Sequence, residues 1–197
     1  MPLHDRILGH FKASAQAKLA TADALAPHIE QAARLMVHSL AEGGKILACG
    51  NGGSAADAQR FAAKMVNRFE QERPGLAALA LTSDPSTLTS IANDYAYEQV
   101  FARQVKVLGH GGDLLLAIST SGNSPSVLQA VAAAHARGMP VIALTGRSGG
   151  GLAEQMQQDD VLLCVPAEST ARIQEIHLLV IHCLCDAVDS VLLGVEE

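Results

Sequence analysis

Five short apolar segments, separated by helical patterns, constrain the fold of this chain more than any other feature. They are KILAC from Lys45, AALAL from Ala77, DLLLAI from Asp113, PVIAL from Pro140 and VLLCV from Val161. Their apolar character is continuous rather than alternating, which predicts strands that are covered on both faces. We therefore expect a three-layer, doubly wound α/β domain of the flavodoxin type, with a five-stranded parallel sheet.

The length of 197 residues suits one domain with a full hydrophobic core. We expect an N-terminal extension of helices over residues 1–43, and an α/β core with a long C-terminal helix over residues 44–197. The stretch from Pro27 to Leu40 is apolar over most of a helical circumference. Such a helix needs partners on two sides, and either a second subunit or the rest of the protomer can supply them.

Composition and charge exclude some classes of function. Aromatic residues make up only 3% of the chain, so the core must consist of Ala, Leu, Val and Ile. The net charge of −6 argues against direct nucleic-acid binding, which depends on Lys and Arg neutralising phosphates. The sequence shows no signal peptide and no run of roughly 18 uncharged apolar residues, so we expect a cytoplasmic protein without a membrane partner.

A glycine-rich turn, CGNGGSAAD from Cys49 to Asp57, follows the first predicted strand and leads directly into a helix. Its glycines let the main chain approach an anionic or polyhydroxyl ligand, and the helix N-terminus offers unpaired N–H groups. The turn has neither the Walker lysine nor the GxGxxG spacing of nucleotide-binding loops. Taken alone, it fits an ordinary strand-to-helix turn equally well.

A hydroxyl-rich turn, ISTSGNSPS over residues 118–126, follows the third predicted strand. Hydroxyls together with the N–H groups of a helix N-terminus can bind a phosphate monoester without Arg or Lys. Ser124 before Pro125 also fits a plain helix cap, for which one hydroxyl is enough. Four hydroxyls therefore favour a ligand, and they belong to Ser119, Thr120, Ser121 and Ser124.

The two turns should lie close together. In the strand order 2-1-3-4-5, the first and third strands are neighbours whose connections leave in opposite directions, and ligands bind at this topological switch point. The segment from Ser90 to Asp94 can bring the Asp94 carboxylate over the same crevice. A helix-ending Asn-Asp turn explains that segment equally well.

These motifs together resemble the SIS-domain phosphosugar proteins. The matching segments are CGNGGSAADA, SIANDYAYEQVFARQ, GDLLLAISTSGNSPSV, VIALTGRSGG and ARIQEIHLLVIH, and they cover nearly the whole chain. The chain is similar to two branches of this superfamily: the phosphoheptose isomerases of lipopolysaccharide-core synthesis, and the DnaA initiator-associating proteins that regulate chromosome replication. The resemblance implies a homotetramer that binds a phosphorylated sugar.

The resemblance also implies which residues contact the sugar phosphate. They are Asn51, Gly52, Gly53, Ser54, Asn93, Asp94, Ser119, Thr120, Ser121, Ser124 and Gln174. The isomerases interconvert sedoheptulose 7-phosphate and D-glycero-manno-heptose 7-phosphate, and a glutamate moves the proton between carbons one and two. Many of them hold zinc with a histidine, that glutamate, a glutamine and a second histidine.

The chain departs from this pattern at two positions. Arg60 stands at the first histidine position and Lys64 at the glutamate position, whereas Gln174 and His182 match the remaining two ligands. Because two cations one helical turn apart repel a dication, we expect no metal and no cofactor. We expect bound zinc only if the alternative, an isomerase, is correct.

Arg60 and Lys64 at positions i and i+4 would be solvated surface charges on an ordinary helix. The family pattern instead puts both in the pocket, where they would favour an anionic ligand such as a sugar acid or a bisphosphate. A protonated Lys64 cannot accept a proton from a sugar carbon, unless burial beside Arg60 leaves it neutral.

The two histidines of the last predicted helix differ in position. Gln174 and His182 are eight residues apart, about 80° around a helix, so both can face the crevice. We expect His182 to line the pocket and His177 to be structural. Catalytic residues are assigned only under the isomerase alternative, and they are then Lys64 and His182.

We prefer the hypothesis of a binding protein over that of an enzyme: a tetrameric regulator of replication initiation that acts through the DnaA initiator and binds a phosphosugar. The loss of the isomerase carboxylate is the reason for this preference. The alternative is a phosphoheptose isomerase with a rearranged base, which could be Lys64, Glu175 or Asp94.

Overall fold

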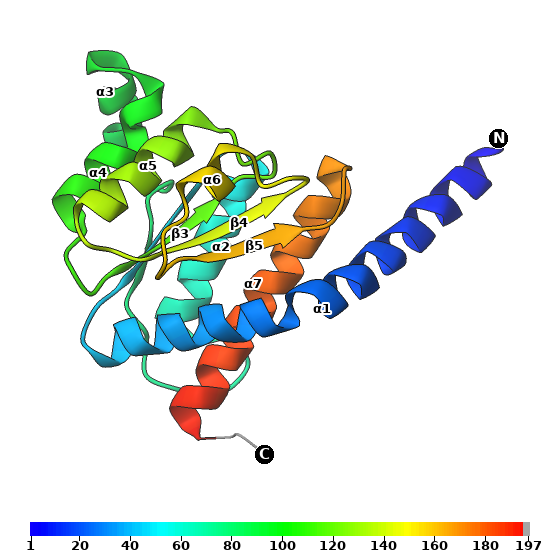
Figure 1. Cartoon of the computed structure of the whole chain (residues 1–197), viewed down its shortest axis with the longest axis horizontal. Coiled ribbons are helices and arrows are strands. Elements are labelled where there is room, and N and C mark those ends of the chain that lie inside the picture. The colour runs from blue at the N-terminus through cyan, green and yellow to red at the C-terminus, as the bar shows by residue number, and fades with distance from the viewer. Residues whose placement is uncertain (195–197) are drawn as a thin grey trace.

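The central sheet has five parallel strands in the order β2-β1-β3-β4-β5 (Figure 1). The computed structural model describes residues 1–194, so the last three residues of the predicted domain lie outside it. The strands are β1 (Ile46–Gly50), β2 (Ala78–Ala80), β3 (Leu114–Ile118), β4 (Val141–Gly146) and β5 (Val161–Val165). Each overlaps one of the predicted apolar segments, and the doubly wound α/β fold is confirmed.

The register of β1 and β3 brings the two predicted turns together. The strands pair along their full length, from Ile46 opposite Leu114 to Gly50 opposite Ile118. Because the paired strands run parallel and end level, the turns that follow them start side by side. We call this the carboxyl end of the sheet, and the opposite end the amino end.

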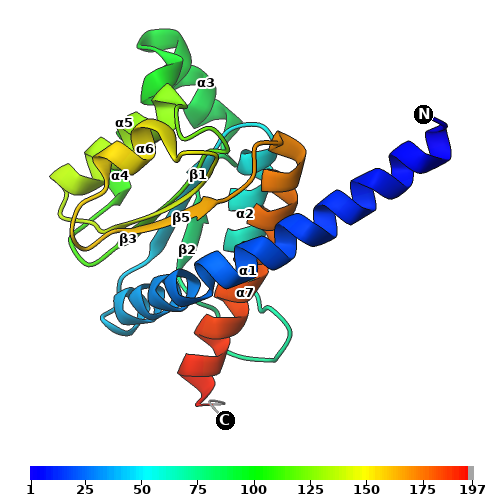
Figure 2. The same ribbon diagram turned by 45° about the vertical axis from the view of Figure 1, so that its right-hand side comes forward.

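Helices cover both faces of the sheet, as Figures 1 and 2 show. One face carries α1 (Leu3–Ala41), α2 (Gly53–Val66) and α7 (Thr170–Leu193). The other face carries α4 (Val100–Leu108), α5 (Pro125–Ala136) and α6 (Gly150–Gln155), with α3 (Pro85–Asp94) and the 3-10 helix η1 (Tyr97–Gln99) beside α4. This double cover explains the continuous apolar character of the strands.

Alternate residues of the strands point into two separate cores. Leu114 and Leu116 of β3 pack in the core beneath α1, α2 and α7, whereas Leu115 packs in the core beneath α4 and α5. Phe61 and Phe101 are buried one on each side, and most of the other members are Ala, Leu, Val and Ile. Small aliphatic side chains therefore fill both layers, as the composition predicts.

Where we predicted several helices over residues 1–43, the structure has one long helix, α1, over Leu3–Ala41. Pro27 lies inside it, and α1 bends in its middle, because proline removes one backbone hydrogen bond and kinks a helix without necessarily ending it. All of its buried residues lie between Thr21 and Ser39. The first half of α1 projects from the body of the protomer (Figure 1).

Helix α7 is the one described helix that is long and apolar enough to cross a membrane by length and composition. It is packed against α1 and α2, and Ile176, Val180 and Leu184 are buried there. Its Asp189 is also buried and forms an ion pair with Arg73. These contacts are those of a core helix.

Candidate functional site

The side chain of Asn51 joins the two predicted turns at the carboxyl end of the sheet. Its Nδ2 donates to the Ser126 hydroxyl over 2.9 Å, and its Oδ1 accepts from the Tyr97 hydroxyl over 2.8 Å. One amide therefore connects the glycine-rich turn, the hydroxyl-rich turn and η1. We did not predict either contact from the sequence, because both join segments that are far apart in the chain.

The glycine-rich turn brings the N-terminus of α2 to the carboxyl end of the sheet. Gly52 precedes the helix with φ +56°, a left-handed conformation that favours glycine, and no side chain caps this end. A Cβ atom on Gly53 would lie 2.7 Å from Nε2 of Gln174. The structure thus brings Gln174 of α7 against the start of α2, where the resemblance implies a shared ligand.

The hydroxyl-rich turn ends at Ser124, which precedes the first residue of α5. Its hydroxyl does not cap the helix and instead lies 3.0 Å from the hydroxyl of Ser119, which is buried. Thr120 and Ser121 are half-buried beside them. The N-termini of α2 and α5 are therefore both without side-chain caps and offer N–H groups and partial positive charge to an anion.

A third turn, between β4 and α6, supports the hydroxyl-rich turn. Gly122 has φ +67°, and a Cβ atom there would lie 1.8 Å from the carbonyl oxygen of Gly149. Asn123 Oδ1 accepts a hydrogen bond from the Gly151 N–H over 2.8 Å. The two turns thus touch through their backbones, a contact that we did not predict from the glycines alone.

Asn93 and Asp94 form the last turn of α3 and are exposed. Asn93 Nδ2 donates to Asp94 Oδ1 over 3.0 Å, so these side chains bind each other rather than either turn. The segment that follows them nevertheless reaches Asn51 through Tyr97. The structure brings this crossover beside the site but leaves both side chains at a helix end.

The two cations of α2 lie further along the same helix. Arg60 Nη1 binds the buried carboxylate of Asp57 over 3.0 Å, although the Arg60 side chain remains 55% exposed. The Lys64 ammonium lies 4.7 Å from the ring centroid of Phe69, and that ring lies 5.7 Å from the His182 ring. Lys64 of α2, Phe69 and His182 of α7 therefore form one cluster, in which the two rings are tilted by 40°.

The electrostatics of this cluster favour a neutral imidazole. Burial lowers the pKa of His182, and the charges of Lys64 and Arg60 lower it further, while Glu70 opposes them. At neutral pH the His182 ring therefore carries a nitrogen lone pair that can accept a proton. Asp57 behaves differently, because burial raises its pKa and the bond to Arg60 acts against this rise.

His177 and Glu175, also on α7, are engaged elsewhere. His177 is buried, its Nε2 lies 3.0 Å from the Thr145 carbonyl oxygen, and burial lowers its pKa to about 4. Glu175 binds the Ser14 hydroxyl and the Arg172 guanidinium, each over 2.7 Å. His177 is thus a neutral core residue, and the Glu175 carboxylate fastens α1 to α7.

The residues at this site do not fit a zinc ion. Among residues 1–194, no three His, Cys, Asp or Glu side chains are grouped so that they could hold a metal. His182 is the one strong donor of the family pattern that remains, and two cations act on it. A dication would face the repulsion of both.

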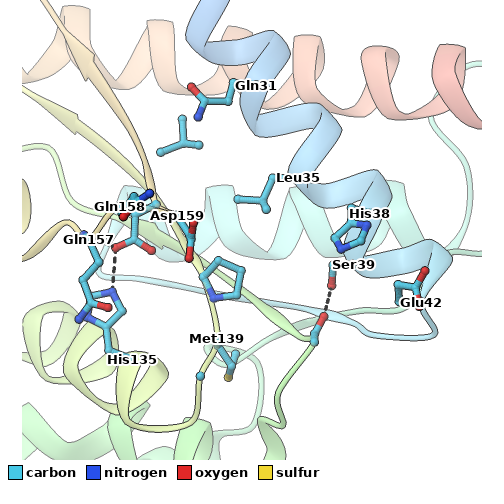
Figure 3. Close-up of a pocket in the computed structure, with 15 residues that line it drawn as sticks. Gln31, Leu35, His38, Ser39, Glu42, His135, Met139, Gln157, Gln158 and Asp159 are labelled. Atoms are coloured by element: carbon cyan, nitrogen blue, oxygen red, sulfur yellow. Dashed lines mark hydrogen bonds and ion pairs between the residues drawn. The ribbon is translucent and has the colours of Figure 1, made fainter.

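A cavity of about 710 Å³ lies at the amino end of the sheet, far from the two turns (Figure 3). It is bordered by the C-terminal half of α1, including Leu35 and His38, and by the segment before β5, including Asp159. His135 and Asp160, which also border it, bind each other, with 2.8 Å between Nε2 and Oδ2. The paired turns at the carboxyl end, rather than this cavity, hold most of the predicted site residues.

Comparisons with known proteins show which family the chain belongs to. A family model described as the SIS domain matches residues 10–146. A phosphoheptose isomerase of Thiobacillus denitrificans is 84% identical over the full length of both chains. The structure of phosphoheptose isomerase GmhA from Neisseria gonorrhoeae is 54% identical, covers 96% of this chain and 100% of that one, and superposes with a TM-score of 0.92. A phosphoheptose isomerase from Francisella tularensis is 51% identical, with the same coverage and a TM-score of 0.94.

These relatives overturn our preferred hypothesis of a DnaA initiator-associating regulator. Proteins that match the chain from end to end at 84% and 64% identity both carry the name phosphoheptose isomerase. We gave too much weight to the loss of one carboxylate, since a proton can be moved by another neutral base. The fold, the paired turns and the match of the family model over residues 10–146 establish that this chain belongs to the SIS-domain family.

Proposed function

We propose that the protein is a phosphoheptose isomerase, which interconverts sedoheptulose 7-phosphate and D-glycero-manno-heptose 7-phosphate. The observation that carries the proposal is the 84% identity, over the full length of both chains, to a protein named phosphoheptose isomerase. The paired turns at the carboxyl end of the sheet support it, because they suit a phosphorylated sugar.

In this proposal the phosphate monoester binds between the N-termini of α2 and α5. The N–H groups there lack side-chain caps, and the hydroxyls of Ser119, Thr120, Ser121 and Ser124 lie around them. Asn51 to Ser54 and Gln174 contact the sugar chain, with Asn93 and Asp94 approaching from α3. This arrangement binds one anionic group and several hydroxyls without a cation at the phosphate.

His182 is the proposed base. Isomerisation needs a group that is neutral at working pH and can accept a proton from a sugar carbon. His182 fits because burial and the two nearby cations lower its pKa. Of the other candidates, Lys64 is an ammonium against an aromatic ring, Glu175 is bound to Ser14 and Arg172, and Asp94 is exposed and bound to Asn93.

The proposal includes a homotetramer in the cytoplasm. The first half of α1 exposes apolar side chains, with Leu3 at 73%, Phe11 at 72% and Leu19 at 70%, and such a surface suits burial against other subunits. Sugar phosphates are charged and do not cross membranes unaided, so an enzyme that uses them works where they are made.

Turnover of sedoheptulose 7-phosphate by the purified protein tests the proposal. We expect the aldoheptose phosphate to accumulate to equilibrium, and His182→Asn to lower the rate by about 10² to 10⁴. His28→Asn, an exposed histidine of α1, is the matched control and should keep full activity. The absence of product from protein that still binds the sugar phosphate would contradict the proposal, and full activity in His182→Asn would contradict the choice of base.

A further inference from the structure

Arg60 and Lys64 lie on the strip of α2 that runs along α7 away from the paired turns. Gln174 contacts Gly53 at the start of α2, and His182, eight residues later on α7, feels the charges of both cations. Arg60 is seven residues beyond Gly53, about 10 Å along the helix axis. This span is comparable to an extended seven-carbon sugar phosphate, so a ligand whose phosphate is held at the turns reaches Arg60 with its other end. Lys64 lies one helical turn further along α2.

The charges of these two cations are only partly neutralised. Asp57 uses one nitrogen of the Arg60 guanidinium, which has five N–H donors in all. Within residues 1–194, no carboxylate lies within ion-pair distance of the Lys64 ammonium, and Glu70, whose charge reaches His182, is exposed to solvent. Positive charge therefore remains at this end of the strip.

The position of Lys64 is also unlike that of a solvated surface charge. Its side chain is half-buried, and its ammonium sits over the Phe69 ring rather than extending into water. Like charges at i and i+4 destabilise a helix, and an anion between them would remove this repulsion. Asp57 binds only one of the two cations, so a further anion between Arg60 and Lys64 would stabilise the pair.

We propose that Arg60 and Lys64 form a metal-free anion site for the end of a sugar phosphate opposite to its phosphate group. The site takes a negatively charged oxygen at carbon one or two, either the enediolate oxygen of an isomerising sugar or the carboxylate of an aldonic acid phosphate. The enediolate part rests on the proposed isomerase function, whereas the carboxylate part concerns binding alone.

During isomerisation the site would act at one defined step. His182 takes a proton from carbon one of the ketose, the electron pair of that C–H bond forms the carbon–carbon double bond, and the carbonyl oxygen at carbon two becomes negative. Lys64 and Arg60 stabilise that oxygen. The proton of the oxygen on carbon one then moves to the oxygen on carbon two, and His182 returns its proton to carbon two, which leaves the aldose. No metal or redox partner is needed, and all atoms are accounted for.

Two hexose derivatives that differ only at carbon one test the inference independently of turnover. We would measure binding of 6-phosphogluconate, which has a carboxylate there, and of glucitol 6-phosphate, which has a neutral CH₂OH. We expect the carboxylate to bind about tenfold more tightly, as charge-assisted hydrogen bonds do. In Lys64→Gln and Arg60→Gln this ratio should fall towards one while glucitol 6-phosphate binds as before.

Matched variants separate charge from packing. Lys106→Gln, an exposed lysine of α4, should leave both affinities unchanged. Lys64→Arg keeps the charge and should keep most of the preference for the carboxylate, and its loss in Lys64→Arg as in Lys64→Gln would overturn the inference. Isomerase activity that survives a chelator and needs no added zinc would support the metal-free site.

The two proposals can fail separately. Turnover without any preference for 6-phosphogluconate would overturn the anion site and leave the isomerase proposal standing. A preference that depends on Lys64, in protein without turnover, would support the anion site and refute the isomerase. Equal affinity for both compounds in the unmodified protein would also remove the basis of the inference.

Discussion

The amino and carboxyl ends of the sheet differ in how side chains bind the backbone N–H groups. At the amino end, Asp160 accepts hydrogen bonds from the backbone N–H groups of Val141 and Gln157 and pairs with His135, and Asp113 makes a similar set of bonds. Carboxylates there satisfy the backbone from within the protomer. A cavity of about 710 Å³ borders this end, but its strongest polar groups are already occupied.

At the carboxyl end, no side chain caps the helix that follows either of the paired turns. The N-termini of α2 and α5 have no side-chain cap, and the hydroxyls around them bind one another, as Ser119 and Ser124 do. The positive end of each helix dipole can therefore interact with a bound anion. The comparison teaches that uncapped helix N-termini beside hydroxyl groups, rather than cavity volume, mark the candidate site in this fold.

The largest expected effect on stability comes from removing a buried carboxylate at the amino end of the sheet. Asp160→Ala removes a carboxylate whose side chain is 2% exposed and leaves its donors unpaired, so the free energy of unfolding should fall by about 3–5 kcal/mol. Urea denaturation measures this loss. Asp159→Ala, an exposed neighbour, should change stability by less than about 0.5 kcal/mol. If the two variants are equally stable, the amino end is not held by its carboxylates.

The substitution Gly122→Ala should disturb the hydroxyl-rich turn at the carboxyl end of the sheet. The new Cβ would meet the Gly149 carbonyl oxygen at a left-handed residue, so the hydroxyl-rich turn must move, at about 3 kcal/mol of stability. Sugar-phosphate binding should disappear with it. Gly138→Ala has a similar φ, +68°, but no neighbouring atom within 4 Å, so it should cost only about 1 kcal/mol and keep binding. Intact binding in Gly122→Ala would show that the turn is not part of the site.

Mild acid should destabilise the carboxyl end of the sheet more than the amino end. His177, beneath the turn after β4, has a pKa lowered to about 4, so between the unfolded value of about 6.5 and pH 4 only the unfolded chain binds its proton. Stability should therefore fall by about 3 kcal/mol over this interval and then level off. Burial raises the pKa of Asp113, but its hydrogen bonds, led by that from Lys45, lower the pKa overall. The ion pair between Asp113 and Lys45 at the amino end should therefore persist over this pH interval.

Denaturation at pH 7 and pH 4.5 measures this dependence. His177→Gln should remove most of the loss, because glutamine does not titrate. An equal pH dependence in the variant would mean that another group controls acid stability.

The smallest effect on stability is expected from removing a hydroxyl at the carboxyl end of the sheet. Ser119→Ala removes one hydrogen bond, worth about 1 kcal/mol, but it should weaken binding of a sugar phosphate about tenfold. Calorimetric titration with glucitol 6-phosphate gives the affinity, and Ser90→Ala on the exposed face of α3 is the control. Unchanged affinity in Ser119→Ala would remove this hydroxyl from the phosphate site.

The sequence predicted those parts of the molecule that depend on local pattern. Continuous apolar runs located β1 to β5, and the switch-point rule paired the turns before any contact was known. The continuity of α1 through Pro27 was missed, because packing after Thr21 and a bend accommodate the proline. The contacts of Asn51 with Ser126 and Tyr97 also escaped prediction, since each joins segments more than forty residues apart.

The activity was harder to predict than the fold. Arg60 and Lys64 led us to prefer a regulator, and the names of the relatives that match the chain over its full length contradict this preference. Residue type alone also did not reveal that the Lys64 ammonium would lie over the Phe69 ring, or that this ring would in turn lie beside that of His182.

The two hydrogen bonds of Asn51 have a consequence for the thermodynamics of binding. With its amide oxygen and nitrogen both engaged, the side chain is confined to one rotamer before any ligand arrives. A side chain ordered during folding loses no further conformational entropy on association, which increases affinity without adding a contact. Tyr97→Phe would release one side of this amide, and its cost would appear as a less favourable binding entropy.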